Sequence, residues 1–135
     1  MANNLDNTAA NFIGKGITFP IKLDKGKPPI EGGKKLVEAS LRDILAWVLG
    51  TRFFLGEYGG KLEYLLQEPD TAVSAALLRY YSVALINTWE KRVENIKVRI
   101  VRREPGKMLI RLEYKISNTQ ISGAFIYPYY SQLIY

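Results

Sequence analysis

The clearest pattern in this chain is the strict alternation in Met108-Leu109-Ile110-Arg111-Leu112-Glu113-Tyr114-Lys115-Ile116. Apolar side chains occupy every second position, and three of the four residues between them are charged. Because successive side chains of a strand point to opposite faces, this pattern predicts a β-strand with one face on a core and the other toward water.

Two neighbouring segments extend this strand into a sheet. Residues 96–101 alternate in the same way, the pair Pro105-Gly106 marks a turn, and residues 120–130 predict a third strand with Phe125 and Tyr127 on one side. Short connections between consecutive strands favour antiparallel pairing. The last third of the chain is therefore predicted to form an antiparallel meander with one apolar face and one charged face.

Two segments have helical periodicity instead. Residues 34–49 place apolar side chains on one stripe, and Gly50 is a stop signal. The stripe consists of Val37, Leu41, Ile44, Leu45 and Val48. A second helix is predicted to run to about Arg92, with Asp70 or Thr71 as its N-cap. Its core-facing stripe is predicted to hold Val73, Leu77, Tyr80, Tyr81, Ala84, Leu85 and Thr88.

These elements predict an α+β fold, in which the three-stranded antiparallel meander packs against two long helices. An extended N-terminal arm over residues 14–22 precedes them, and Phe53, Phe54 and Tyr58 are expected to anchor the loop between the helices to the core. Residues 1–13 are polar and aperiodic for the most part and are predicted to be a flexible tail. Residues 14–135 are predicted to be a single domain.

Composition narrows the classes of function. The 135 residues carry a net charge of +6 and contain neither cysteine nor histidine. Disulfides and thiolate zinc sites are thereby excluded, and the commonest general base and metal ligand is missing, so we expect no enzyme, no metal and no cofactor. The sequence contains no apolar run of about 20 residues that could span a bilayer. The protein is therefore expected in the cytoplasm, or outside it only within a larger particle.

Several motifs, in order along the chain, resemble those of one family. They are Gly14-Lys15-Gly16-Ile17-Thr18-Phe19-Pro20, Leu41-Arg42-Asp43-Ile44-Leu45, Tyr58-Gly59-Gly60-Lys61-Leu62, Leu65-Leu66-Gln67-Glu68-Pro69-Asp70, Trp89-Glu90-Lys91-Arg92-Val93 and Tyr127-Pro128-Tyr129. This set resembles the gene-25-like baseplate wedge family of contractile phage tails and injection systems, which includes the type VI secretion subunit TssE.

The resemblance implies a structural subunit without catalytic activity. Its implied partners are other baseplate wedge subunits, with which it shares a core bundle, and the tail sheath protein, whose first ring starts on its sheet; the central hub or spike is a further candidate. No contact with nucleic acid or with a membrane is implied. TssE proteins tend to carry Glu-Pro-Arg where this chain has Glu68-Pro69-Asp70, which favours a phage-like or extracellular contractile particle, or a divergent secretion subfamily.

Three surfaces are predicted to bind partners. The uncharged third strand is predicted to lie at a sheet edge, where another chain's strand could pair with it, and the loop before the second helix is a further candidate. Trp47 and the outer side of the second helix are expected to be covered by a partner. The predicted contact residues are Glu68, Pro69, Asp70, Trp47, Val83, Ile86, Ile121, Phe125 and Tyr127. An equal alternative for the strand edge is that the arm at residues 17–22 covers it.

Two other functions remain open at this stage. A peptidoglycan-cleaving, lysozyme-like enzyme would need two carboxylates across a cleft, and the candidates are Glu57, Glu63, Glu68 and Asp70. A nucleic-acid-binding domain would use basic residues on the outer sheet face, although Glu113 interrupts that face and the aromatic residues lie elsewhere. These basic residues are Lys97, Arg99, Arg102, Arg103, Arg111 and Lys115.

Overall fold

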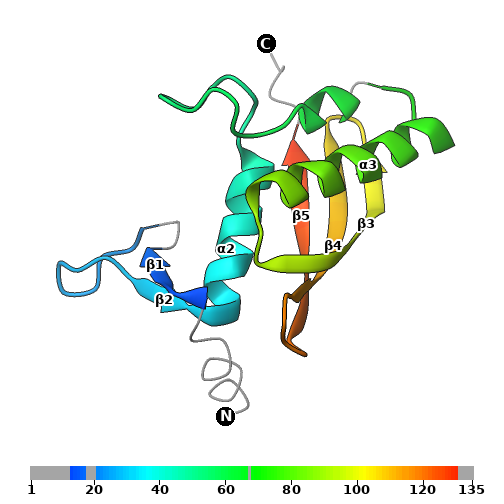
Figure 1. Cartoon of the computed structure of the whole chain (residues 1–135). Coiled ribbons are helices and arrows are strands. Elements are labelled where there is room, and N and C mark those ends of the chain that lie inside the picture. Colours follow the sequence, from blue (N-terminus) through cyan, green and yellow to red (C-terminus); the bar gives the residue numbers. More distant parts are fainter. Residues whose placement is uncertain (1–12, 18–20, 67, 131–135) are drawn as a thin grey trace.

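The computed structural model describes residues 13–17, 21–66 and 68–130. The elements in chain order are β1 (Lys15–Ile17), β2 (Ile30–Gly32), α2 (Gly33–Ala46), the 3-10 helix η2 (Leu62–Leu66), α3 (Ala72–Trp89), β3 (Val93–Glu104), β4 (Lys107–Ile116) and β5 (Ser122–Tyr130). In Figure 1, α3 lies across one face of the β3-β4-β5 sheet with α2 beside it, and the β1-β2 hairpin projects from the other side of α2. The predicted tail falls almost wholly outside the described residues.

The predicted meander is confirmed. Strands β3, β4 and β5 form an antiparallel sheet in that order. The alternate side chains of β4, from Met108 to Ile116, are each at most 2% exposed. Val98 of β3 and Phe125 of β5 are buried beside them. One face of the sheet therefore forms the core, as the alternation indicates.

The first helix has the predicted core stripe but ends three residues early. Val37, Leu41, Ile44 and Leu45 are buried, as expected. The helix ends at Ala46 because the next residues hydrogen-bond to another segment: the Gly60 amide donates to the Trp47 carbonyl at 3.1 Å, and the Leu49 amide to the Gly60 carbonyl at 3.1 Å. These bonds tie the end of α2 to the glycine pair.

The predicted core-facing stripe of α3 is wrong for all its residues except Leu85, which packs against the core. The side chains that pack on the core are Ser74, Leu78, Ser82 and Ile86. Val73, Tyr80 and Tyr81, predicted to face the core, are 69%, 69% and 51% exposed. Both sides of this helix are largely apolar, so hydrophobicity alone does not select the buried one. The small serines on the inner side allow the helix to lie close to the sheet.

The start of α3 is capped by Thr71 and not by Asp70. The Ser74 amide donates to Thr71 Oγ1 at 3.2 Å, and the Thr71 amide donates to Ser74 Oγ at 3.1 Å. This reciprocal pair is a capping box. It fixes the point at which the loop carrying Glu68, Pro69 and Asp70 enters the helix.

One expectation about the loop between the helices is wrong. Of the three aromatic residues expected to anchor the loop between the helices, only Tyr58 is buried, whereas Phe53 and Phe54 are 81% and 94% exposed. As for the alternative that the arm at residues 17–22 covers β5, residues 18–20 lie outside the described residues, and the described Lys15–Ile17 pair with β2. Within the described residues, β5 is paired with β4 alone.

Candidate partner-binding surfaces

The free edge of β5 is the most open pairing surface of the sheet. The nine residues of β5 include no charged side chain. The other edge strand, β3, carries charged residues along its length, and its register shifts between Glu94 and Lys97 and again between Ile100 and Arg102. Charges and bulges hinder strand addition. An added strand would therefore pair with β5 more readily than with β3.

The register of β5 shows which of its backbone groups face outward. The Ile116 amide donates to the Ile121 carbonyl at 2.9 Å, and the same register continues to Tyr130. In an antiparallel ladder the backbone groups of alternate residues point to opposite neighbours. Residues 121, 123, 125, 127 and 129 therefore face β4, and residues 122, 124, 126, 128 and 130 face the free edge. Pro128, which has no amide hydrogen, sits on the open side, where an edge strand tolerates proline.

The three predicted contact residues at β5, Ile121, Phe125 and Tyr127, belong to the residues whose backbone groups face β4. Phe125 is only 6% exposed, and Ile121 and Tyr127 are partly buried against the core. The Tyr129 hydroxyl, on the same side, donates to the Leu45 carbonyl at 2.7 Å. These side chains hold β5 against α2. A partner can therefore reach the outward backbone groups of β5 but not these side chains. The sequence pattern identifies the strand but not which alternate residues are accessible.

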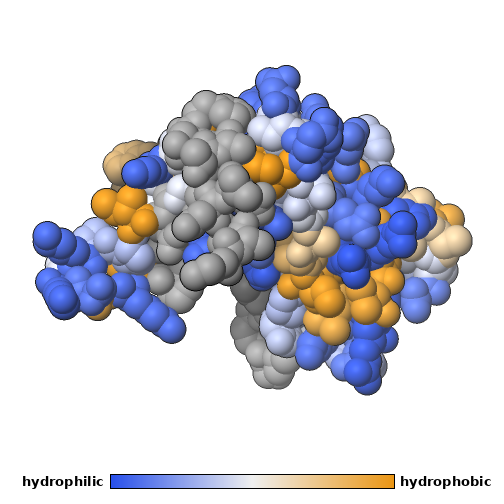
Figure 2. Space-filling view, turned by 90° about the horizontal axis from the view of Figure 1, so that it is seen from below, coloured by the Kyte–Doolittle hydropathy of each residue, from blue (hydrophilic) through white to orange (hydrophobic). Residues whose placement is uncertain are grey.

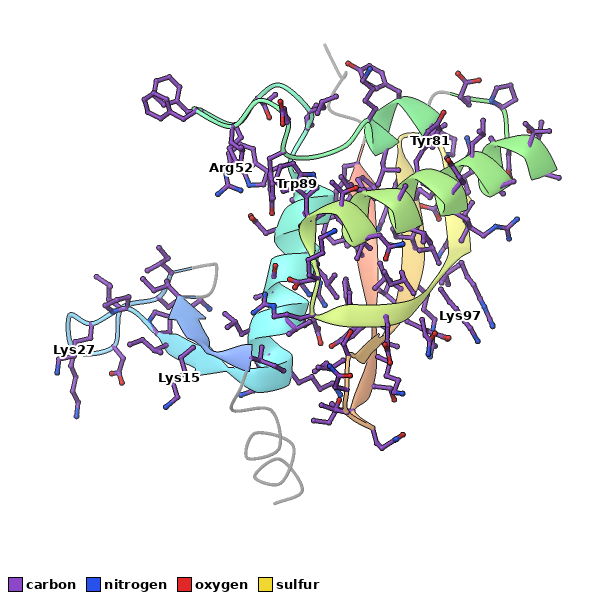
Figure 3. The ribbon with its side chains drawn as sticks, in the orientation of Figure 1. Lys15, Lys27, Arg52, Tyr81, Trp89 and Lys97 are labelled. Carbon is purple, nitrogen blue, oxygen red and sulfur yellow. The ribbon has the colours of Figure 1, made fainter. Side chains whose placement is uncertain are left out.

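The outer side of α3 forms an apolar surface beside a groove. Val73, Leu77, Tyr80 and Tyr81 are exposed there. The groove, of about 700 Å³, is lined by Gly60, Lys61, Leu62, Tyr64, Leu65, Tyr81, Ala84, Leu85 and Thr88. Figure 3 shows Tyr81 on α3 beneath η2. In contrast, Ile86 is fully buried and Val83 is partly buried against the core, so these two predicted contacts lie on the wrong side of the helix.

The loop with Glu68, Pro69 and Asp70 is exposed and held from beneath by an arginine of β3. Arg103 Nη2 donates to the Leu65 carbonyl at 3.0 Å and also to the Glu68 carbonyl. Its Nη1 lies 3.3 Å from Ser74 Oγ and 3.6 Å from the Asp70 carboxylate. Sequence analysis placed Arg103 on the outer sheet face, but the register shift before Arg102 allows it to reach inward.

Trp47 takes part in a cluster within the chain. Its Nε1 donates to Asp43 Oδ1 at 3.0 Å, and the Tyr58 hydroxyl donates to Asp43 Oδ2 at 3.1 Å. The Arg52 guanidinium lies 4.3 Å from the centre of the Tyr58 ring, and Trp89 packs edge-on to the same ring (Figure 3). Burial, together with the negative charge of Asp43, raises the pKa of Tyr58 to about 12. Trp47 is partly buried, and its polar atom already has a partner within the chain.

The motif Trp89-Glu90-Lys91-Arg92-Val93 contains a buried ion pair that sequence analysis did not identify. Glu90, 4% exposed, accepts from Arg92 Nε at 2.7 Å and Nη2 at 2.8 Å, and from Ser40 Oγ of α2 at 2.7 Å. Burial alone would raise the pKa of Glu90, but the hydrogen bonds from Arg92 and Ser40 outweigh it and lower that pKa. The acid and the base two residues apart in the motif, Glu90 and Arg92, were the sequence signal that could have indicated this ion pair.

The geometry offers little to the two alternative functions. The side chains of Glu57, Glu68 and Asp70 are exposed, and Glu63 lies among residues whose side chains are not described. Among three of the hollows in the described structure, Glu113 is the one carboxylate in the lining. No cluster of three potential metal ligands occurs among the described residues.

On the outer sheet face, basic residues alternate with acids. Lys97 pairs across the strands with Glu113, Lys115 lies 3.4 Å from the Glu94 carboxylate, and Arg111 lies 3.2 Å from the Glu113 carboxylate. The buried aromatic residues of β5 lie on the opposite face. Tyr130 is the exposed aromatic residue of β5, with Lys107 Nζ 5.6 Å from the centre of its ring, and a single ring is not the row of aromatic side chains that a stacking platform uses.

Comparison with known proteins identifies the fold and the family. A chain in the cryo-EM structure of the anti-feeding prophage baseplate is 18% identical with a TM-score of 0.64, covering 96% of this chain and 93% of that one. A candidate tail lysozyme from Geobacter sulfurreducens is 24% identical with a TM-score of 0.65, covering 72% of this chain and 89% of that one. No curated protein matches significantly. None of the described helices is long and apolar enough to cross a membrane. The sequence profile of baseplate wedge protein gp25 matches residues 31–120, and the chain belongs to this family.

Proposed function

We propose that this protein is a non-enzymatic wedge subunit in the baseplate of a contractile injection system, such as a phage tail, an extracellular contractile particle or a type VI-like secretion machine. It joins other wedge subunits in a core bundle, and its sheet templates the first ring of the tail sheath by strand pairing. Family membership supports the structural role, and the open edge of β5 is the observation that carries the proposed mechanism.

The β5 edge has the properties that strand addition requires. Its outward amides at Ser122, Ala124 and Ile126 follow one another at alternate positions, so a partner strand gains a regular ladder over this stretch. Pro128 removes the next outward amide and so limits the ladder in that direction. Main-chain pairing depends on register and an open edge more than on particular side chains. In the described structure, no strand of this chain pairs with the outward backbone groups of β5.

The outer side of α3 is the proposed contact with the other wedge subunits. The groove between η2 and α3 is largely apolar, and Tyr64 and Tyr81 are among its lining residues. An amphipathic helix of a larger wedge subunit would cover this groove and the exposed Val73, Leu77 and Tyr80. This contact is on the opposite side of α3 from Val83 and Ile86. Glu68 and Asp70 lie beside it, at the start of the same helix.

The proline substitution Ala124→Pro tests the strand-pairing mechanism. It removes an outward amide while leaving the bonds to β4 in place, because residue 124 faces the free edge. Ala124→Thr keeps that amide and is the matched control. In a host whose own copy is deleted, we expect Ala124→Pro to give baseplates without sheathed tubes, counted by electron microscopy, and Ala124→Thr to give normal tubes. Tubes of normal number with Ala124→Pro would refute the pairing mechanism, and native protein absent from purified baseplates would refute the wedge function itself.

A further inference from the structure

The β1-β2 hairpin is held firmly at its base. Ile13, directly before it, is buried in the core. Gly16 lies against Leu36 of α2 so closely that a Cβ there would be 3.1 Å from Leu36 Cδ1. The hairpin then runs directly into α2 through Gly33, which is buried and has a φ of +61°. Its position relative to the domain is therefore set by packing at its root.

The tip of the hairpin is a tight, defined turn. Asp24 and Lys27 exchange two backbone hydrogen bonds, of 3.0 and 2.9 Å. The two residues between them, Lys25 and Gly26, both have positive φ, of 48° and 78°. This is the pattern of a primed two-residue hairpin turn, whose twist matches that of paired strands. The turn holds Lys25 and Lys27 at its outer end.

The body of this hairpin exposes aliphatic side chains that nothing in the described structure covers. Ile17 and Ile30 lie directly opposite each other in the register and are 50% and 67% exposed. Ile21 and Leu23, nearer the turn, are 49% and 66% exposed. A two-stranded ribbon without a core of its own is marginally stable in water. These four side chains therefore favour a surface that would cover them.

Charge indicates the nature of that surface. Between Ile21 and Ile30 the chain carries Lys22, Lys25 and Lys27 against the single acid Asp24, and all four residues are exposed. Figure 2 shows hydrophilic residues gathered at the outer end of the hairpin with hydrophobic residues beside them. Figure 3 shows Lys15 and Lys27 pointing away from the domain. Aliphatic side chains bordered by cations match an apolar strip bordered by carboxylates.

We infer that the β1-β2 hairpin docks on an acidic surface of another protein subunit, through the four aliphatic residues at the centre and Lys22, Lys25 and Lys27 at the rim. The inference rests on the proposed function in one respect: it assumes that the other subunit belongs to the same assembled particle. A protein surface fits better than a lipid surface, because both outer edges of the ribbon present backbone groups that hydrocarbon cannot satisfy.

Charge reversal at the tip tests this inference. The variant K22E/K25E/K27E changes three residues that are fully on the surface, so its thermal unfolding should match that of the native protein. In a host lacking the native copy, we expect at least tenfold less of this variant in purified particles, by quantitative immunoblot. The conservative variant K22R/K25R/K27R keeps the charge, and K97E/R99E/R102E makes the same change of charge on the sheet; both should stay within twofold of native.

The possible outcomes separate the hypotheses. Native incorporation of K22E/K25E/K27E would overturn the docking inference, as would an equal loss with K97E/R99E/R102E, which would indicate a general charge effect. Binding of the native protein to vesicles with about one-third anionic lipid, lost in K22E/K25E/K27E, would overturn it in favour of a membrane contact. In native particles, carbodiimide, which joins amines directly to carboxylates, should link Lys25 to an aspartate or glutamate of a neighbouring subunit. Absence of the native protein from the particles would instead refute the proposed function.

Discussion

The buried carboxylate of Glu90 gives the sharpest test of how this fold is held together. It accepts hydrogen bonds from the Arg92 side chain, from the Arg92 amide at 3.1 Å and from Ser40 Oγ. It therefore joins the end of α3 to α2 and to the start of β3. Replacing it by glutamine keeps the shape and one acceptor oxygen but removes the charge and places an amide group against the donors of Arg92.

The expected loss of stability follows from these contacts. A hydrogen bond to a charged group contributes about 1.5–3 kcal/mol, and breaking a buried ion pair costs about 3–5 kcal/mol. The Arg92 side chain is 32% exposed, so water recovers part of the loss. We therefore expect Glu90→Gln to lower the free energy of unfolding by about 2–3 kcal/mol. For a domain that is typically stable by about 5–15 kcal/mol, this is a large fraction.

Urea unfolding followed by tryptophan fluorescence measures this loss, because Trp89 adjoins the ion pair. Glu94→Gln is the control: Glu94 forms a surface pair with Lys115 at 3.4 Å, and surface pairs contribute about 0–1 kcal/mol. The lowered pKa of Glu90 fixes the sign of the pH dependence. Its contribution is present above the unfolded-state value of about 4.3 and is lost as the pH falls through the lower folded value. The native protein and Glu90→Gln should therefore differ at neutral pH and converge in acid. Equal effects of Glu90→Gln and Glu94→Gln at pH 7 would refute the reasoning.

Three further experiments test the packing. Gly59→Ala would place a Cβ 2.5 Å from a backbone oxygen at a φ of +104° and should cost about 3 kcal/mol in urea unfolding, whereas Gly56→Ala meets no atom within 4 Å and should be neutral or slightly stabilising. Ile86→Ala should cost about 2–4 kcal/mol and Tyr80→Ala less than about 1 kcal/mol, and the opposite order would restore the original assignment of the faces of α3. In an ultraviolet titration, Tyr58 should ionise near pH 12. Burial of its neutral form therefore contributes stability below about pH 10, and this contribution is lost as the pH rises through 12. If Tyr58→Phe keeps as many late-ionising tyrosines as the native protein, the reasoning is contradicted.

The sheet could be predicted from sequence because each strand has one wet face. In β4 every second residue from Met108 to Ile116 is apolar, and a one-residue slip would expose all of them. Helix α3 has no such contrast, because only Arg79 of its 18 residues is charged. The polarity pattern therefore does not predict which face of α3 is buried. The buried face carries the small residues Ser74 and Ser82, and its fit to the sheet depends on a surface that is not local in sequence.

Features set by register were also beyond the sequence pattern. The outward residues of β5 follow from its pairing with β4, and Arg103 reaches the loop at residues 65–70 only because β3 changes register before Arg102. The sequence predicts an extended arm over residues 14–22 but not its pairing into the β1-β2 hairpin, since the two strands are three residues each and the turn Asp24-Lys25-Gly26-Lys27 stands between exposed residues. Local patterns predicted the elements, and non-local pairing decided which of their atoms are accessible.

The acid at position 70, where related secretion subunits tend to carry arginine, has a specific consequence in this chain. Arg103 approaches the Asp70 carboxylate at 3.6 Å, but that carboxylate is 75% exposed, and such pairs contribute about 0–1 kcal/mol. The loop is held chiefly by the uncharged acceptors of Arg103, the carbonyls of Leu65 and Glu68. Asp70→Arg should therefore change the free energy of unfolding by less than about 1 kcal/mol, whereas Arg103→Ala should cost about 2 kcal/mol, because it removes the charged donor that the Leu65 and Glu68 carbonyls share. If urea unfolding gives that order, the side chain at position 70 is not required by the fold. Its charge is then available to match a partner, and the same Asp70→Arg variant, scored for incorporation into particles, would report whether it does.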